Sequence, residues 1–70
     1  MVEKETVLDK AVRQVAEAKR HIAEQRQGIE KLRAAGISTI DAEHTLEVLI
    51  SSLLRLENHE KYIRKHSLKK

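Results

Sequence analysis

The chain has 70 residues, a net charge of +3 and no cysteine. This length allows one small domain at most, and the absence of cysteine excludes disulfide bonds as a source of stability. No run approaches the roughly 20 apolar residues of a transmembrane helix, and the first residues lack the basic-then-apolar order of a secretory signal. We therefore expect a cytoplasmic protein with no membrane partner.

Residues 6–35 are predicted to form the first helix. Thr6 or Asp9 is the candidate N-terminal cap, and the segment is rich in Ala, Glu, Gln, Lys and Arg, which favour helix. The large apolar residues that recur every seven positions are Leu8, Val15, Ile22 and Ile29. This heptad pattern predicts a narrow apolar stripe of the kind that packs against one other helix.

Residues 36–38 are predicted to form a turn. Gly36 is the candidate left-handed residue just beyond a helix end, since only glycine adopts that conformation without a steric cost. Ser38 or Thr39 can then cap a second helix, and Ser38-x-x-Asp41 resembles a capping box with Asp in place of Glu. These signals favour a hairpin over the alternative, one continuous helical rod that dimerises.

Residues 39–66 are predicted to form the second helix, and the basic tail continues to residue 70. The apolar residues at heptad spacing are Leu46, Leu49, Leu53, Leu56 and Ile63. Ile50 and Leu54 lie beside this stripe, one helical turn apart, and widen it to roughly half of the helix circumference. One narrow partner helix cannot cover so wide a stripe. The sequence therefore predicts that a second chain covers the remainder.

The predicted fold is all-α, an antiparallel, coiled-coil-like hairpin of two helices that dimerises into a four-helix bundle. The pairs expected to face each other within the hairpin are Ile29 with Leu46, Ile22 with Leu53, Ala18 with Leu56 and Leu32 with Ala42. The residues expected at the hairpin and dimer interfaces are Ile22, Ile29, Leu46, Leu49, Ile50, Leu53, Leu54 and Leu56. Because oligomerisation is a common remedy for a small core, a homodimer is the expected partner arrangement.

Charged residues border both stripes. We expect Glu57 to pair with Lys19 inside a hairpin or with Arg26 between two chains. Such charges fix the register and orientation of packed helices more than they add stability.

No catalytic, cofactor or metal residues are predicted. His59-Glu60 begins like a metalloprotease helix motif, but Ile63 occupies the position where a second histidine is required. The chain also has no glycine-rich phosphate loop and no nucleophile–histidine arrangement. The sequence therefore argues against an enzyme, and metal-dependent activity built from histidines of two chains is the weakest of three hypotheses.

The segment Lys61–Lys70 is the one charge asymmetry. It contains five Lys or Arg residues and no acid, so the alternative function is association with nucleic acid through phosphate contacts. Lysine and arginine at a helix C-terminus also complement the helix dipole, which is the more ordinary explanation.

Residues 16–66 resemble a group of small, uncharacterised bacterial proteins. The matching features are His21-Ile22-Ala23-Glu24, the Ile29-x-x-Leu32 spacing, Gly36 before Thr39, Ala42-Glu43 and the leucine repeat from Leu46 to Leu56. The resemblance implies a bacterial source and a helical hairpin, and it implies no activity. The leading prediction is thus a non-enzymatic structural or protein-interaction module whose partner is itself or an unidentified protein.

Overall fold

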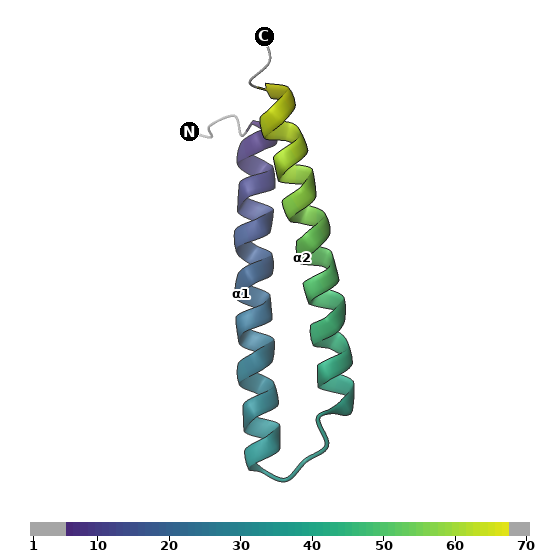
Figure 1. The fold of residues 1–70 in the computed structure, drawn as a ribbon. Coiled ribbons are helices and arrows are strands. Elements are labelled where there is room, and N and C mark those ends of the chain that lie inside the picture. The colour runs from purple at the N-terminus through teal and green to yellow at the C-terminus, as the bar shows by residue number, and fades with distance from the viewer. Residues whose placement is uncertain (1–5, 68–70) are drawn as a thin grey trace, which may run out of the picture.

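The computed structural model describes residues 6–67 as two helices joined by a short connection. Helix α1 (Val7–Ala34) and helix α2 (Ile40–Ser67) run antiparallel, so the start of α1 and the end of α2 lie at the same end of the hairpin (Figure 1). No strand occurs in the described range. The predicted all-α hairpin is confirmed, and both helices begin and end within one residue of the predicted positions.

A complete capping box starts α1. The Asp9 backbone N–H donates to Thr6 Oγ1 at 2.9 Å, and the Thr6 backbone N–H donates to Asp9 Oδ2 at 3.4 Å. The first N–H groups of a helix have no partner inside the helix, and the box satisfies them with local side chains. The two candidate caps therefore act together, with Thr6 as the cap and Asp9 as its reciprocal partner.

We expect Thr6→Ala to lower the free energy of unfolding by about 1 kcal/mol, because it removes the hydroxyl that accepts from Asp9. Urea denaturation at a fixed protein concentration measures this loss. Thr45→Ala is the matched control, since its hydroxyl bonds to the Asp41 carbonyl inside a helix and alanine is the better helix former there. Equal losses in both variants would contradict a specific role for the cap.

Helix α1 ends in a Schellman motif. The Ile37 N–H donates to the Leu32 carbonyl at 2.9 Å, and the Gly36 N–H donates to the Arg33 carbonyl at 3.1 Å. Gly36 has φ +74°, and no other described residue has a positive φ. The left-handed conformation predicted for this glycine is therefore present, and it turns the chain away from the axis of α1.

The start of α2 differs from the predicted capping box. The Thr39 carbonyl accepts the first helical N–H, from Glu43 at 2.8 Å, so Thr39 rather than Ser38 is the cap residue. The third helical position is then Ala42, whose side chain cannot complete a box. Ser38 Oγ accepts only a long bond of 3.4 Å from the Ile40 N–H, and Thr39 Oγ1 instead donates to Glu43 Oε2 at 2.9 Å.

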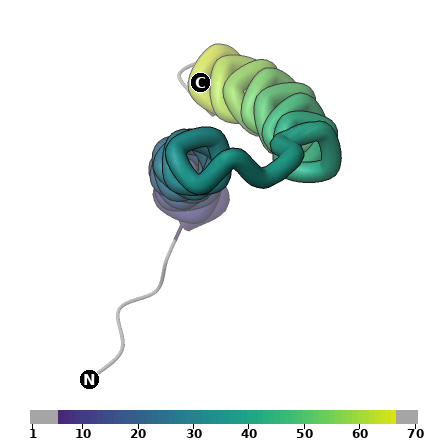
Figure 2. The backbone as a smooth tube through the Cα atoms, turned by 90° about the horizontal axis from the view of Figure 1, so that it is seen from below, coloured from purple at the N-terminus to yellow at the C-terminus, as the bar shows by residue number. Residues whose placement is uncertain are grey.

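The hairpin is a single layer of two helices, and the side chains of α1 are more deeply buried than those of α2. Its principal extents are 55 × 29 × 12 Å, and α2 is inclined to α1 when viewed along the helices (Figure 2). The buried apolar residues all belong to α1 and are Ala11, Val15, Ile22 and Ile29. No residue from 40 to 66 is buried. Helix α2 thus covers the narrow stripe of α1, whereas its own wider stripe is only partly covered.

Two shallow hollows between the helices show which levels of α1 and α2 adjoin. Ile29 and Leu46 line one of them, and Ala18 and Leu56 line the other, as predicted for these two pairs. The Ala42 carbonyl, by contrast, accepts from Gln25 Nε2 at 2.9 Å, one heptad farther from the turn than the predicted neighbour Leu32. The Gln25 amide lies in the partly buried seam and needs a partner, which this carbonyl supplies.

Gly28 lies inside α1 beside open space, since a Cβ added there would meet nothing within 4 Å. Lys19 and Glu57 form no ion pair within the described residues, so the alternative in which Glu57 pairs with Arg26 between two chains stays a prediction. Over that same part of the chain, neither helix combines the length and the apolar character that crossing a membrane requires.

Candidate self-association surface

The predicted interface residues fall into three groups by exposure. Ile22 and Ile29 are buried beneath α2. The half-buried group lies along α2 and contains Leu46, Leu49, Ile50, Leu53 and Leu56. Leu54 is 57% exposed. The hairpin therefore accounts for the burial of the α1 residues and leaves the α2 residues with apolar surface in contact with water.

One face of the hairpin, here called the Ile50 face, carries Ile50 and Leu54 on α2. Glu43 and Glu57 lie seven residues on either side of Ile50, and Glu47 lies seven residues before Leu54. Residues at spacings of four and seven share one side of a helix. Helix α2 therefore presents a central apolar pair on this face, with carboxylates both toward the turn and toward the termini.

Helix α1 contributes basic residues to the Ile50 face. Lys19, Arg26 and Arg33 recur every seven residues along α1, and all three are exposed. Arg26 and Arg33 line a hollow of about 220 Å³ together with Glu43 of α2. Basic residues of α1 and acidic residues of α2 thus lie next to each other on the same face.

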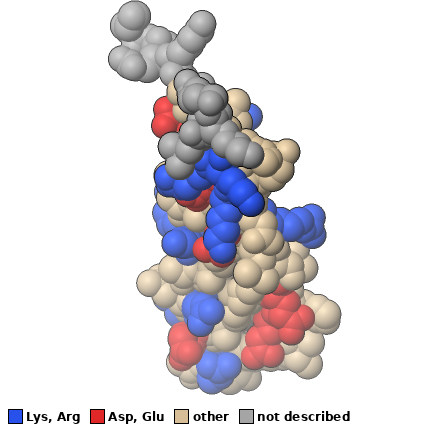
Figure 3. All heavy atoms as spheres, turned by 45° about the horizontal axis from the view of Figure 1, so that its top comes forward, with Lys and Arg blue, Asp and Glu red and all other residues tan. Residues whose placement is uncertain are grey.

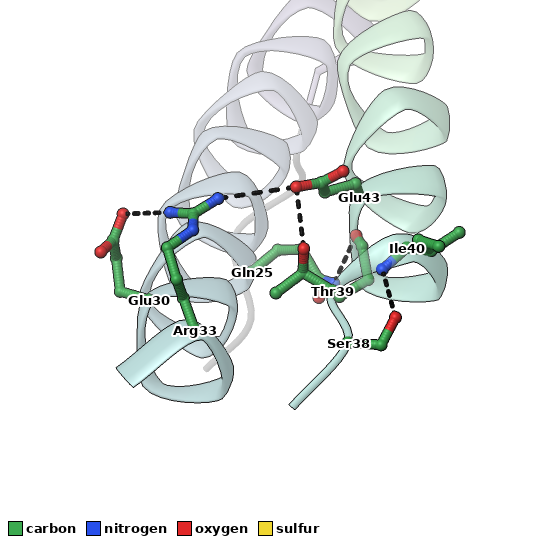
Figure 4. A network of polar contacts seen from close by, with 8 residues as sticks. Gln25, Glu30, Arg33, Ser38, Thr39, Ile40 and Glu43 are labelled. Atoms are coloured by element: carbon green, nitrogen blue, oxygen red, sulfur yellow. Dashed lines mark hydrogen bonds and ion pairs between the residues drawn. The ribbon is translucent and has the colours of Figure 1, made fainter. Parts of the chain in front are cut away.

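Arg33 joins the two helices beside the turn. Its Nη1 is 3.2 Å from Glu30 Oε2, and its Nη2 is 3.6 Å from Glu43 Oε2 (Figure 4). The same Glu43 oxygen also accepts a hydrogen bond from the Thr39 hydroxyl. These groups are exposed, so the ion pairs contribute little to stability. Their value here is geometric, because they show which sides of α1 and α2 form the Ile50 face.

The opposite face has a different character. A hollow of about 240 Å³ is lined there by Gln14, Glu17, Ala18, His21, Leu49, Ser52 and Leu56. Val48 is 63% exposed, and helical spacing places it away from Ile50 and Leu54. This face combines neutral and small residues with isolated apolar ones and has no pair of charged stripes.

The histidines do not gather into a metal site. No group of three or more potential ligands occurs in residues 6–67. His21 Nδ1 is 3.7 Å from Glu24 Oε1, an acid three residues farther along the same helix. His66 instead packs its ring edge-on against Tyr62, with ring centroids 4.0 Å apart. The described residues therefore lend no support to the metal hypothesis.

The basic tail lies partly in α2 and partly outside the described residues. Arg64 Nε is 2.7 Å from Glu60 Oε2, so a carboxylate just before the tail offsets one of its cations. Figure 3 shows basic side chains near the terminal end of the hairpin and a group of acidic side chains over the turn half of α2. Association with nucleic acid through Lys61–Lys70 stays a prediction, because its last three residues are not described.

Comparison of the chain with protein-family models, curated proteins and solved structures finds no match. The resemblance to small bacterial proteins therefore stays a prediction. Evidence about function comes from the surface of the hairpin.

Proposed function

We propose that this chain is a non-enzymatic self-association module in which two hairpins pack through their Ile50 faces into a four-helix bundle. Its role is structural, or it presents a paired helical surface to another protein. The proposal extends the hairpin by one further layer and assigns Ile50 and Leu54 to the contact between chains.

The unequal core is the observation that carries this proposal. Among residues 6–66, all four buried apolar residues belong to α1, and the leucine-rich α2 has none. Each fully buried leucine or isoleucine contributes about 1.5–3 kcal/mol, so the half-covered side chains of α2 leave much of that stabilisation unused. A second hairpin on this side would recover part of it.

The thickness of the hairpin leads to the same expectation. A stable domain usually has two packed layers around one core, whereas this hairpin measures 12 Å across its thinnest direction. Stacking two hairpins gives the second layer, with helices spaced by about 8–10 Å.

Size-exclusion chromatography with light scattering tests the proposal. We expect twice the 8.1 kDa chain mass at high concentration, and a melting temperature that rises with protein concentration. Leu54→Glu should raise the dimer Kd by about a hundredfold or more, because the new carboxylate would be buried without a partner. A wild-type chain that stays monomeric at all concentrations would overturn the proposal.

Val48→Glu is the matched control. Val48 lies on the same helix, is apolar and is as exposed as Leu54, but it points away from the Ile50 face. We expect its dimer Kd to stay within a fewfold of wild type. If Val48→Glu dissociated the dimer and Leu54→Glu did not, the contact would lie on the other side of α2.

A further inference from the structure

If the proposed dimer forms, the charges on the Ile50 face favour one orientation of the two hairpins relative to each other. The α1 side of this face is mainly basic: it carries Lys19, Arg26 and Arg33 against one acid, Glu30. The α2 side is mainly acidic: it carries Glu43, Glu47 and Glu57 against one base, Lys61, which lies seven residues after Leu54. The axes of two helices in contact are about 8–10 Å apart, so charged side chains that reach toward each other come closer than the Debye length of about 8 Å at physiological salt. The way one hairpin is placed on another therefore changes the electrostatic energy.

Two-fold symmetry allows two ways to stack the Ile50 faces. If the axis runs along the helices, α1 of each chain lies on α2 of the other and both turns are at the same end. If the axis runs across the helices, α1 lies on α1 and the turns are at opposite ends. The first arrangement places basic stripes on acidic stripes, and the second places the two basic stripes on each other.

The levels of the side chains agree with the first arrangement. An axis along the helices keeps every residue at its own height, so residues level with each other in one hairpin are also level across the dimer. Arg33 is 3.6 Å from Glu43 and therefore lies near the level of the partner's Glu43. Arg26 is three residues farther from the turn than Ile29, which adjoins Leu46, so it lies between the levels of the partner's Glu47 and the partner's Ile50. A two-fold axis along the helices does not allow one hairpin to shift along the other. The agreement in height between these side chains is therefore fixed by the fold of the single hairpin.

The apolar pair also meets suitable residues in this arrangement. Ala18 and Leu56 line the second hollow together, so in the antiparallel hairpin Ala23 lies near the level of Ile50 and Leu54. Ala16 and Ala23 are exposed and seven residues apart, on the side of α1 that carries Lys19. Small side chains there leave room for the larger aliphatic residues of a second chain.

We infer that two copies of the chain associate with their turns at the same end, α1 of each hairpin lying against α2 of the other. The termini of both chains then also share one end. All four neighbouring helix pairs are antiparallel, and basic and acidic stripes alternate around the bundle.

Nitroxide labels and pulsed electron paramagnetic resonance test the orientation, and the cysteine-free chain permits single-site labelling. With a label at Ser38→Cys, we expect a short distance between the two labels. Turns at opposite ends would separate them by the length of a 28-residue helix, about 42 Å. A label at His66→Cys should also give a short distance. Ser51→Cys, near mid-height, reports dimer formation in either orientation.

The outcomes separate the two proposals. Long distances at both ends, in a labelled protein that light scattering shows to be dimeric, would overturn the orientation and leave the dimer intact. A monomeric protein would overturn the proposed function itself.

A charge reversal supplies a second, independent readout. We expect Arg26→Glu to raise the dimer Kd roughly threefold to tenfold, because it places carboxylates on both sides of the contact. Adding Glu47→Arg to the same chain should restore much of the affinity. If basic stripes faced each other instead, Arg26→Glu would relieve repulsion and lower the Kd, which would contradict the inferred orientation.

Discussion

Ile29→Ala is expected to lower the free energy of unfolding by about 2–5 kcal/mol, the largest effect of any single truncation considered. Ile29 is 5% exposed and is the buried residue of α1 that lies nearest the turn, where α2 covers it. Removing three carbons there loses their transfer free energy and leaves a space that two inclined helices fill only in part. Small domains have a total stability of about 5–15 kcal/mol, so the loss is a large fraction of it.

Urea denaturation followed by circular dichroism at a fixed protein concentration measures this effect. Ile40→Ala is the matched control, because it is the same substitution at a side chain that is 67% exposed at the start of α2. We expect a change of at most about 0.5 kcal/mol at that position. Similar losses at both positions would mean that the core is not organised around the α1 stripe.

Alanine at the two glycines is expected to change stability in opposite directions. Gly36→Ala should destabilise the hairpin by about 1–2 kcal/mol, because φ +74° places a Cβ against the following carbonyl. Gly28→Ala should stabilise it by about 0.5–1 kcal/mol, because Gly28 lies inside α1 and an added Cβ meets nothing within 4 Å. The same chemical change thus tests the turn and the helix interior separately.

Thermal melts of the two variants, compared at one concentration, give this result directly. The double variant should lie near the sum of the single effects, because the two sites share no partner. A stabilising Gly36→Ala would show that the Schellman turn is not required for the hairpin. Valine at position 36 should cost more than alanine, since a branched Cβ is more crowded in the left-handed conformation.

Light scattering should also be recorded for the Gly36 variants. A chain that cannot close its turn has the option of straightening and pairing with a second extended chain, which would change the size of the particle and keep its helix content.

The amino-acid sequence by itself determined the two helices and their ends. Thr6 with Asp9 starts α1, and Gly36 stops it, through contacts between residues at most five positions apart. Such contacts depend only on local geometry, so residue types and spacing are enough to predict them. The heptad of α1 likewise identified Val15, Ile22 and Ile29, which are buried, because a period close to the helical repeat places them on one side. Leu8, the first residue of that heptad, is only half-buried.

Only the tertiary structure decided which side chains of one helix or of the connection bond to groups farther along the chain. The sequence offered Ser38 or Thr39 as the α2 cap, and the path of the chain after Gly36 makes Thr39 the first helical acceptor and turns its hydroxyl toward Glu43. Gln25 bonds to a carbonyl 17 residues away, a choice that depends on the inclination and register of α2. Partners of this kind are set by distances across the hairpin, which no local pattern encodes.

The unequal core is the clearest example of this division. The sequence predicted that the stripe of α2 was too wide for one partner helix, because composition and period measure the width of a stripe. Which helix has the more deeply buried side chains depends on the angle and register at which the two helices pack. In the folded hairpin it is α1 that is covered, and Ile50 and Leu54 of α2 keep their surface available because no third element exists in the described chain to cover them.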